Sequence, residues 1–146
     1  MCEHCNYPEM LESRGITPTP LREAVLSSIG DVGRPLAAVE IMASVRSRMP
    51  INKVTFYRII DLLVDKGLVR RLSAGDRAFR YGMGETPYHP DHPHFVCTRC
   101  GAMECLEPEM LPAGINNLQA GDKRIIKRVD VRFEGICESC VKAACE

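Results

Sequence analysis

Two Cys-x-x-Cys pairs, Cys97 with Cys100 and Cys137 with Cys140, lie far apart in this sequence and limit the folds that are open to it. Four thiolates in two such pairs are typical of a structural Zn²⁺ site, in which four ligands surround the ion tetrahedrally. The ion would join two distant segments and add folding free energy to a region of about 60 residues, which alone buries little core. We therefore expect a small zinc-stabilised domain in the C-terminal part.

A second group of metal-binding side chains precedes the first cysteine pair. Imidazole and carboxylate ligands suit a divalent ion that exchanges, whereas four thiolates suit a permanent zinc ion. The sequence thus predicts a structural zinc and a separate regulatory divalent metal, a combination that suggests a sensor. The candidate regulatory ligands are His89, Asp91, His92, His94 and, just beyond the pair, Cys105.

Other interpretations of the remaining cysteines stay open. The N-terminal Cys2, His4 and Cys5 could supply further metal ligands, or they could belong to a disordered terminus. Cys105 could instead be a small buried apolar residue, as free cysteines often are.

The composition is that of a soluble globular protein. Of the 146 residues, 45% are hydrophobic and 26% are charged, and no apolar run is long enough to span a membrane. The first residues lack the basic and apolar regions of a signal peptide. We expect a cytoplasmic protein with no membrane partner, in which the eight cysteines act as metal ligands or redox thiols.

Positive charge is concentrated in one part of a chain whose formal net charge is zero. Residues 44–80 contain nine Lys and Arg residues against three Asp residues. Such a local excess is typical of a surface that meets nucleic-acid phosphates.

The same region has the pattern of a DNA-binding fold. A first helix is predicted after Thr19-Pro20, where apolar residues recur at helical spacing until Gly30 and Gly33. A second helix is predicted from Ala37 to about Ser47, and a third from Asn52 to Lys66-Gly67. Two short runs, 68–72 and 77–81, then flank a Gly-Asp turn and predict a basic β-hairpin. Three helices and a hairpin predict a winged helix-turn-helix, in which the third helix enters the DNA major groove.

The C-terminal part predicts a small mixed domain. Short strands are expected at 95–96 and 102–106, on either side of the first cysteine pair, with a weak helix at 107–119. Alternating residues from Val129 to Phe133 predict a half-buried strand that ends at Gly135, just before the second pair. The fold class is therefore α+β.

Several motifs resemble the ferric uptake regulator (Fur) family. They lie in the family's order along residues 11–140, and are GITPTPLR at 15–22, VTFYRII at 54–60, KGLV at 66–69, HPHFVCTRCG at 92–101 and GICESC at 135–140. The resemblance implies a metal-dependent transcriptional repressor that binds operator DNA as a homodimer. It also implies a winged-helix domain over 1–82, a hinge with the His-rich cluster over 83–94, and a dimerisation and structural zinc domain over 95–146.

The resemblance also assigns roles to individual residues. The four cysteines match the family's structural zinc ligands, and His92 and His94 match two regulatory ligands. Tyr57 and Arg58 match DNA contacts, although Tyr57 could instead be a partly buried helix residue. The full set expected to bind DNA is Lys53, Thr55, Tyr57, Arg58, Arg70 and Arg77.

Other family ligands have no counterpart in this sequence. Arg34-Pro35 stands where the family has a histidine, Arg80-Tyr81-Gly82 lacks the acidic residue of the hairpin's exit, and Val129 replaces a histidine of an accessory site.

These departures favour zinc as the regulatory metal. Thiolate and imidazole ligands select Zn²⁺ over Fe²⁺ and Mn²⁺, and the stretch from Cys100 to Cys105 is similar to zinc-uptake regulators of the family. An iron- or peroxide-responsive regulator, using Fe²⁺ or Mn²⁺, is the alternative within the fold. A zinc hydrolase is the alternative from another class, for which the sequence offers no convincing general base.

Overall fold

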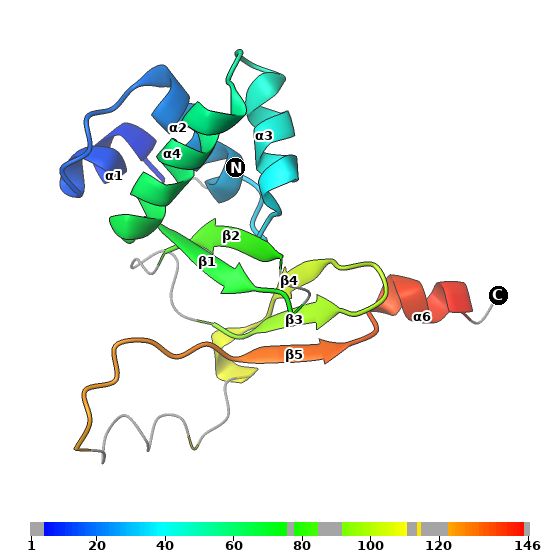
Figure 1. Ribbon diagram of the computed structural model, residues 1–146. Coiled ribbons are helices and arrows are strands. Elements are labelled where there is room, and N and C mark those ends of the chain that lie inside the picture. Colours follow the sequence, from blue (N-terminus) through cyan, green and yellow to red (C-terminus); the bar gives the residue numbers. More distant parts are fainter. Residues whose placement is uncertain (1–4, 76–77, 85–91, 111–113, 115–122, 145–146) are drawn as a thin grey trace. The chain divides into compact units, whose positions relative to one another are not determined.

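The computed structural model describes residues 5–75, 78–84, 92–110, 114 and 123–144, and the chain divides into two compact units, residues 1–89 and 90–146 (Figure 1). Among the helices of these described residues, none has the length and apolar character needed to cross a membrane. The mixed helical and sheet content confirms the predicted α+β class.

The first unit is a winged helix-turn-helix. Its elements are α1 (Tyr7–Ser13), α2 (Pro20–Gly30), α3 (Ala38–Arg46), α4 (Lys53–Asp65), β1 (Val69–Ser73) and β2 (Phe79–Met83). The predicted caps are confirmed, because the Thr19 and Asn52 side chains accept hydrogen bonds from backbone N–H groups in the first turns of α2 and α4. Helix α1 was not predicted, although Asn6 caps it and a proline stands in its first turn.

The core of this unit is built on one face of α4. Phe56, Ile59, Ile60 and Leu63 are buried there, as the helical spacing predicts. They belong to one apolar cluster with side chains of α1, α2, α3 and β1. The opposite face of α4 is thereby left available to a partner.

The strands of the wing are shifted along the sequence relative to the prediction. Strands β1 and β2 pair antiparallel from Val69 opposite Met83 to Ser73 opposite Phe79. The runs expected at 68–72 and 77–81 lie at Val69–Ser73 and Phe79–Met83, because the register pairs the start of β1 with residues past Tyr81. Leu36 exchanges two backbone hydrogen bonds with Tyr81, so the wing is tied to the segment before α3.

The second unit contains a three-stranded sheet. Its elements are β3 (His94–Cys97), β4 (Met103–Cys105), the 3₁₀ turn η1 (Pro108–Met110), β5 (Arg132–Gly135) and α6 (Glu138–Ala144). The strand order is β4-β3-β5, with β3 antiparallel to β4 and parallel to β5. The sheet thus brings together the chain segments that carry the two cysteine pairs.

Two expectations for this unit need correction. The last strand begins at Arg132 rather than Val129, and Phe133 is 42% exposed, so the strand is less buried than its alternation predicts. Within the range expected to be a helix, 107–119, the structure describes a 3₁₀ turn at Pro108–Met110 and a helical residue at Gly114, and most of the rest lies outside the described residues, so the start of the helix alone differs from the prediction. In the sequence, Pro112 falls in the interior of the expected helix, where proline removes a backbone hydrogen bond.

Candidate metal centres and nucleic-acid interface

Parallel pairing of β3 and β5 assembles the four-cysteine cluster. Cys97 ends β3 and is paired with Gly135, the last residue of β5. Cys100 follows in the turn after β3, while Cys137 and Cys140 lie at the start of α6 and within it. Because the two strands end side by side, both pairs are delivered to one end of the sheet.

The spacing of the sulfur atoms fits a tetrahedral zinc ion. The Sγ atoms of Cys100 and Cys137 are 3.8 Å apart, and all four sulfurs lie within 4.8 Å of one another. Zinc–sulfur bonds of about 2.3 Å in a tetrahedron put neighbouring sulfurs about 3.8 Å apart. The four side chains therefore fit the ion that the sequence predicts.

Backbone amides prepare one of these thiols for metal binding. The Sγ of Cys97 accepts hydrogen bonds from the N–H groups of Cys100 and Cys137, each at 3.4 Å, and these lower the pKa of Cys97 to about 6. For Cys140 the direction is opposite: a hydrogen bond between the Cys140 and Cys137 side chains, together with burial, raises the pKa of Cys140 to about 12. A Zn²⁺ ion would thus meet one thiolate already formed and displace a proton from Cys140.

A second group of possible ligands lies at the other end of β3. One ligand atom from each of His92, His94 and Cys105 lies within 4.8 Å of the other two. The imidazole rings of His92 and His94 have centroids 4.6 Å apart. These three side chains form what we call the His-His-Cys cluster, and their donor atoms suit zinc.

Strand register explains how Cys105 joins the two histidines. His94 begins β3 and is directly opposite Cys105, the last residue of β4. The pairing is extended by a hydrogen bond from the Leu106 N–H to the Pro93 carbonyl at 2.9 Å. Side chains directly opposite in an antiparallel pair share one face of the sheet. Cys105 therefore belongs with the histidines.

The exposure of Cys105 decides between the two interpretations of this residue, a metal ligand or a buried apolar residue. His94 is buried with only 8% of its surface exposed, and Cys105 is exposed, so the interpretation of Cys105 as a buried apolar residue is wrong. Partial burial of its thiol raises the pKa of Cys105. Metal binding there would require loss of the thiol proton.

The remaining candidate ligands fall into two groups. His89, Asp91, Cys2 and His4 lie outside the described residues. Glu104, next to Cys105 on β4, is exposed, and neighbouring residues of a strand point to opposite faces.

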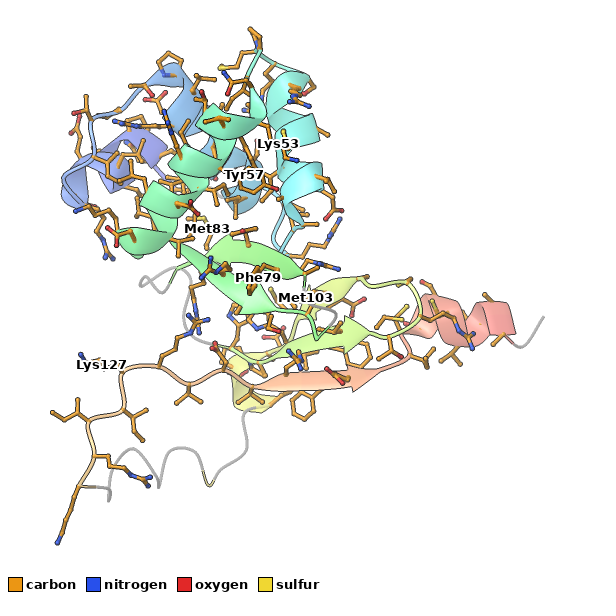
Figure 2. The ribbon with its side chains drawn as sticks, in the orientation of Figure 1. Lys53, Tyr57, Phe79, Met83, Met103 and Lys127 are labelled. Atoms are coloured by element: carbon orange, nitrogen blue, oxygen red, sulfur yellow. The ribbon has the colours of Figure 1, made fainter. Side chains whose placement is uncertain are left out.

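The predicted DNA-binding residues divide by exposure on α4. Lys53 and Arg58 are exposed, whereas Thr55 and Tyr57 are half-buried. The Tyr57 ring packs edge-on against Phe56 with centroids 5.3 Å apart, and Figure 2 labels it with Lys53 on the same helix. The helix thus presents two exposed cations and a partly covered phenol.

The wing adds an arrangement that the sequence analysis missed. The guanidinium of Arg71 lies 4.7 Å from the centroid of the Phe79 ring, a cation–π contact on the exposed side of the hairpin. The alternation of β1 and β2 could have revealed it, because Arg71 and Phe79 occupy alternate positions of one face. Of the two arginines predicted to bind DNA here, Arg70 is half-buried and Arg77 lies outside the described residues.

Some of the basic residues counted in the sequence serve the fold instead. Arg48 donates hydrogen bonds to the Ala24 carbonyl and to the hydroxyls of Ser27 and Ser28. Arg46 donates to the Ile51 carbonyl at 3.2 Å. The local positive excess therefore overstates the charge that faces a partner.

Comparison with known proteins gives one family. A model of the Ferric uptake regulator family matches residues 13–132. The Ferric uptake regulation protein of Bacillus subtilis (strain 168) is 29% identical over 134 residues, which cover 90% of this chain and 90% of that protein. The structure of the Vibrio cholerae ferric uptake regulator has a TM-score of 0.73 at 18% identity, covering 90% of this chain and 100% of that one.

A zinc uptake regulator solved with zinc and DNA has a TM-score of 0.66 at 23% identity, and the match covers 94% of this chain and 92% of that one. At these identities the two structures establish a shared fold, while the family model matches most of the chain.

Proposed function

This chain is a member of the ferric uptake regulator family, and from that premise we propose that it represses transcription in response to Zn²⁺ bound by the His-His-Cys cluster. Members of the family are dimeric DNA-binding transcription regulators rather than enzymes, and this membership sets aside the zinc-hydrolase alternative. Its partners are operator DNA and a second copy of the chain, and its place of action is the cytoplasm.

The observation that carries the zinc assignment is the presence of a sulfur donor beside two imidazoles. His92, His94 and Cys105 offer three ligand atoms within 4.8 Å of one another. Zinc is commonly bound by nitrogen and sulfur ligands, whereas Fe²⁺ and Mn²⁺ favour shells richer in oxygen and nitrogen. A fourth ligand would complete a tetrahedral shell.

The four cysteines are assigned a different task. Cys97, Cys100, Cys137 and Cys140 would hold a structural zinc that stays bound while the signal changes, because four thiolates close the coordination shell. We keep the division of the chain at 1–82, 83–94 and 95–146, in which the middle segment carries His92 and His94 and the last part carries Cys105 with the four cysteines.

Residues of the second unit offer a surface for the second copy of the chain. Strand β5 is at the edge of its sheet, and Phe133, Ile136 and Val141 are each more than 40% exposed. An edge strand with exposed apolar neighbours is suited to pairing with another chain. In the proposed mechanism the regulatory metal favours the dimer arrangement that matches two DNA half-sites, and its differential affinity sets the response.

Replacing both histidines by alanine tests the assignment. For His92→Ala/His94→Ala we expect one zinc ion fewer per chain, a retained dimer, and no increase in DNA affinity on adding Zn²⁺. Zinc content is measured by atomic emission, and DNA binding by fluorescence anisotropy on a promoter duplex.

The matched control is Glu104→Ala, which removes an exposed potential ligand outside the cluster and should leave the response intact. A double-histidine variant that still binds DNA in response to zinc would show that the cluster is not the sensing site.

A further inference from the structure

Helix α4 exposes an apolar side chain among polar ones at its N-terminal end. Val54 is 61% exposed, although valine is usually buried in a helix that packs on a core. Val54, Arg58 and Asp61 recur at the i, i+4 and i+7 positions, so they lie on one face of α4. That face is opposite the buried stripe.

The side chains next to Val54 at the start of α4 do not offer an exposed apolar surface. The Asn52 side chain accepts the N–H of Thr55 at 2.8 Å, so its oxygen is committed to capping the helix. Thr55 is half-buried. Lys53 is exposed, and its long flexible ammonium side chain suits phosphate contacts, which position a protein on DNA without reading its sequence.

In a helix-turn-helix protein, the N-terminal residues of the recognition helix contact the edges of bases in the major groove. The C5-methyl group of thymine is the apolar group that the base pairs present in this groove. Val54 therefore has the position and the chemistry to meet it.

We propose that Val54 contacts the C5-methyl group of one thymine in each half-site and so contributes to operator specificity. The contact removes two apolar surfaces from water, and loss of one methyl-sized group costs about fourfold in affinity. Cytosine presents no methyl group at that position, so the contact distinguishes T·A from C·G.

The test combines a protein change with a base change. The full-length zinc-loaded dimer first selects a duplex from a random-sequence pool, with Mn²⁺ used instead if Zn²⁺ enriches nothing. Each thymine of the footprint is then replaced singly by deoxyuridine, which lacks only the methyl group. Affinities of the wild type and of Val54→Ala are measured on every duplex.

We expect one uracil position in each half-site to weaken wild-type binding about fourfold and to weaken Val54→Ala by a clearly smaller factor, while Val54→Ala is weaker on the unmodified duplex. Alanine is a better helix former than valine, so helix loss does not account for the weakening. Val39→Ala, which changes a valine that is 69% exposed in the first turn of α3, is the matched control and should keep the full uracil effect.

Equal uracil penalties for the wild type and Val54→Ala at every position would overturn the proposal. Unchanged affinity of Val54→Ala for the unmodified duplex would do the same. If Zn²⁺ enriches no duplex and Mn²⁺ does, the zinc assignment is wrong, and the uracil test of Val54 can still be carried out on the Mn²⁺-selected duplex.

Discussion

Cys105 distinguishes the proposed sensing site from one made of nitrogen and oxygen donors alone. It stands opposite His94 in the β3–β4 pairing and contributes the one sulfur of the His-His-Cys cluster. A thiolate favours Zn²⁺, and a carboxylate of similar size favours harder divalent ions. The choice of metal therefore depends on a single side chain.

Replacing Cys105 by aspartate should shift the metal preference. For Cys105→Asp we expect the regulatory site to lose about tenfold or more in Zn²⁺ affinity, or ~1.4 kcal/mol, while Mn²⁺ affinity is retained or rises. Competition titrations with a chromophoric chelator measure both affinities, and the structural zinc should remain bound. An unchanged ratio of zinc to manganese affinity in Cys105→Asp would contradict the role of sulfur at this position.

At the scale of residues, the spacing of residues in the sequence identified candidate ligands, but it did not show which of them lie together in the structure. His92 and His94 were identified as candidate ligands because they immediately precede a cysteine pair. The link between His94 and Cys105 could not be derived from spacing, because it depends on the register of two strands. Conversely, Arg48 was counted as a phosphate-facing charge, and its hydrogen bonds to α2 are long-range contacts that composition does not reveal.

At the scale of elements, strong local signals were sufficient in the first unit. The caps at Thr19 and Asn52 and the apolar stripe of α4 gave helices close to those observed. Helix α1 was missed because it is only seven residues long and buries Leu11 alone, which gives little periodicity to detect. The parallel pairing of β3 with β5 was also not predicted, since it joins segments that are distant in sequence.

The parallel pair and the four cysteines should fold as one unit. The proposed structural zinc would hold the ends of β3 and β5 together. The binding free energy of such a zinc ion, about 10–16 kcal/mol, is comparable to or larger than the roughly 5–15 kcal/mol stability of a typical domain. For Cys137→Ala we expect loss of the zinc and of hydrogen-exchange protection in β3, β4 and β5, with α2, α3 and α4 still protected.

The matched control is Cys105→Ser, which removes a thiol outside the four-cysteine cluster. It should retain the structural zinc and the protection of β3. Protection of β3 and β5 in Cys137→Ala equal to that of the wild type would show that zinc does not hold this sheet together.

At the scale of the whole molecule, the order of its parts followed from the sequence. A winged helix-turn-helix precedes a zinc-binding sheet, as the change from helical periodicity to cysteine pairs and short strands indicates. Each candidate metal cluster lies at one end of β3, so one four-residue strand carries ligands of both. In the proposed assignment, a permanent zinc would therefore position the strand that carries His94, a proposed sensing ligand.

The proposed mechanism makes the chain a repressor that binds DNA when Zn²⁺ occupies the His-His-Cys cluster. The most direct test is DNA binding by the full-length dimer, with its structural zinc in place, to a duplex from its own promoter at buffered free Zn²⁺, Fe²⁺ and Mn²⁺. We expect tight binding at a far lower free concentration of Zn²⁺ than of the other two ions. Tighter control by Fe²⁺ or Mn²⁺, or binding that is indifferent to all three, would contradict it.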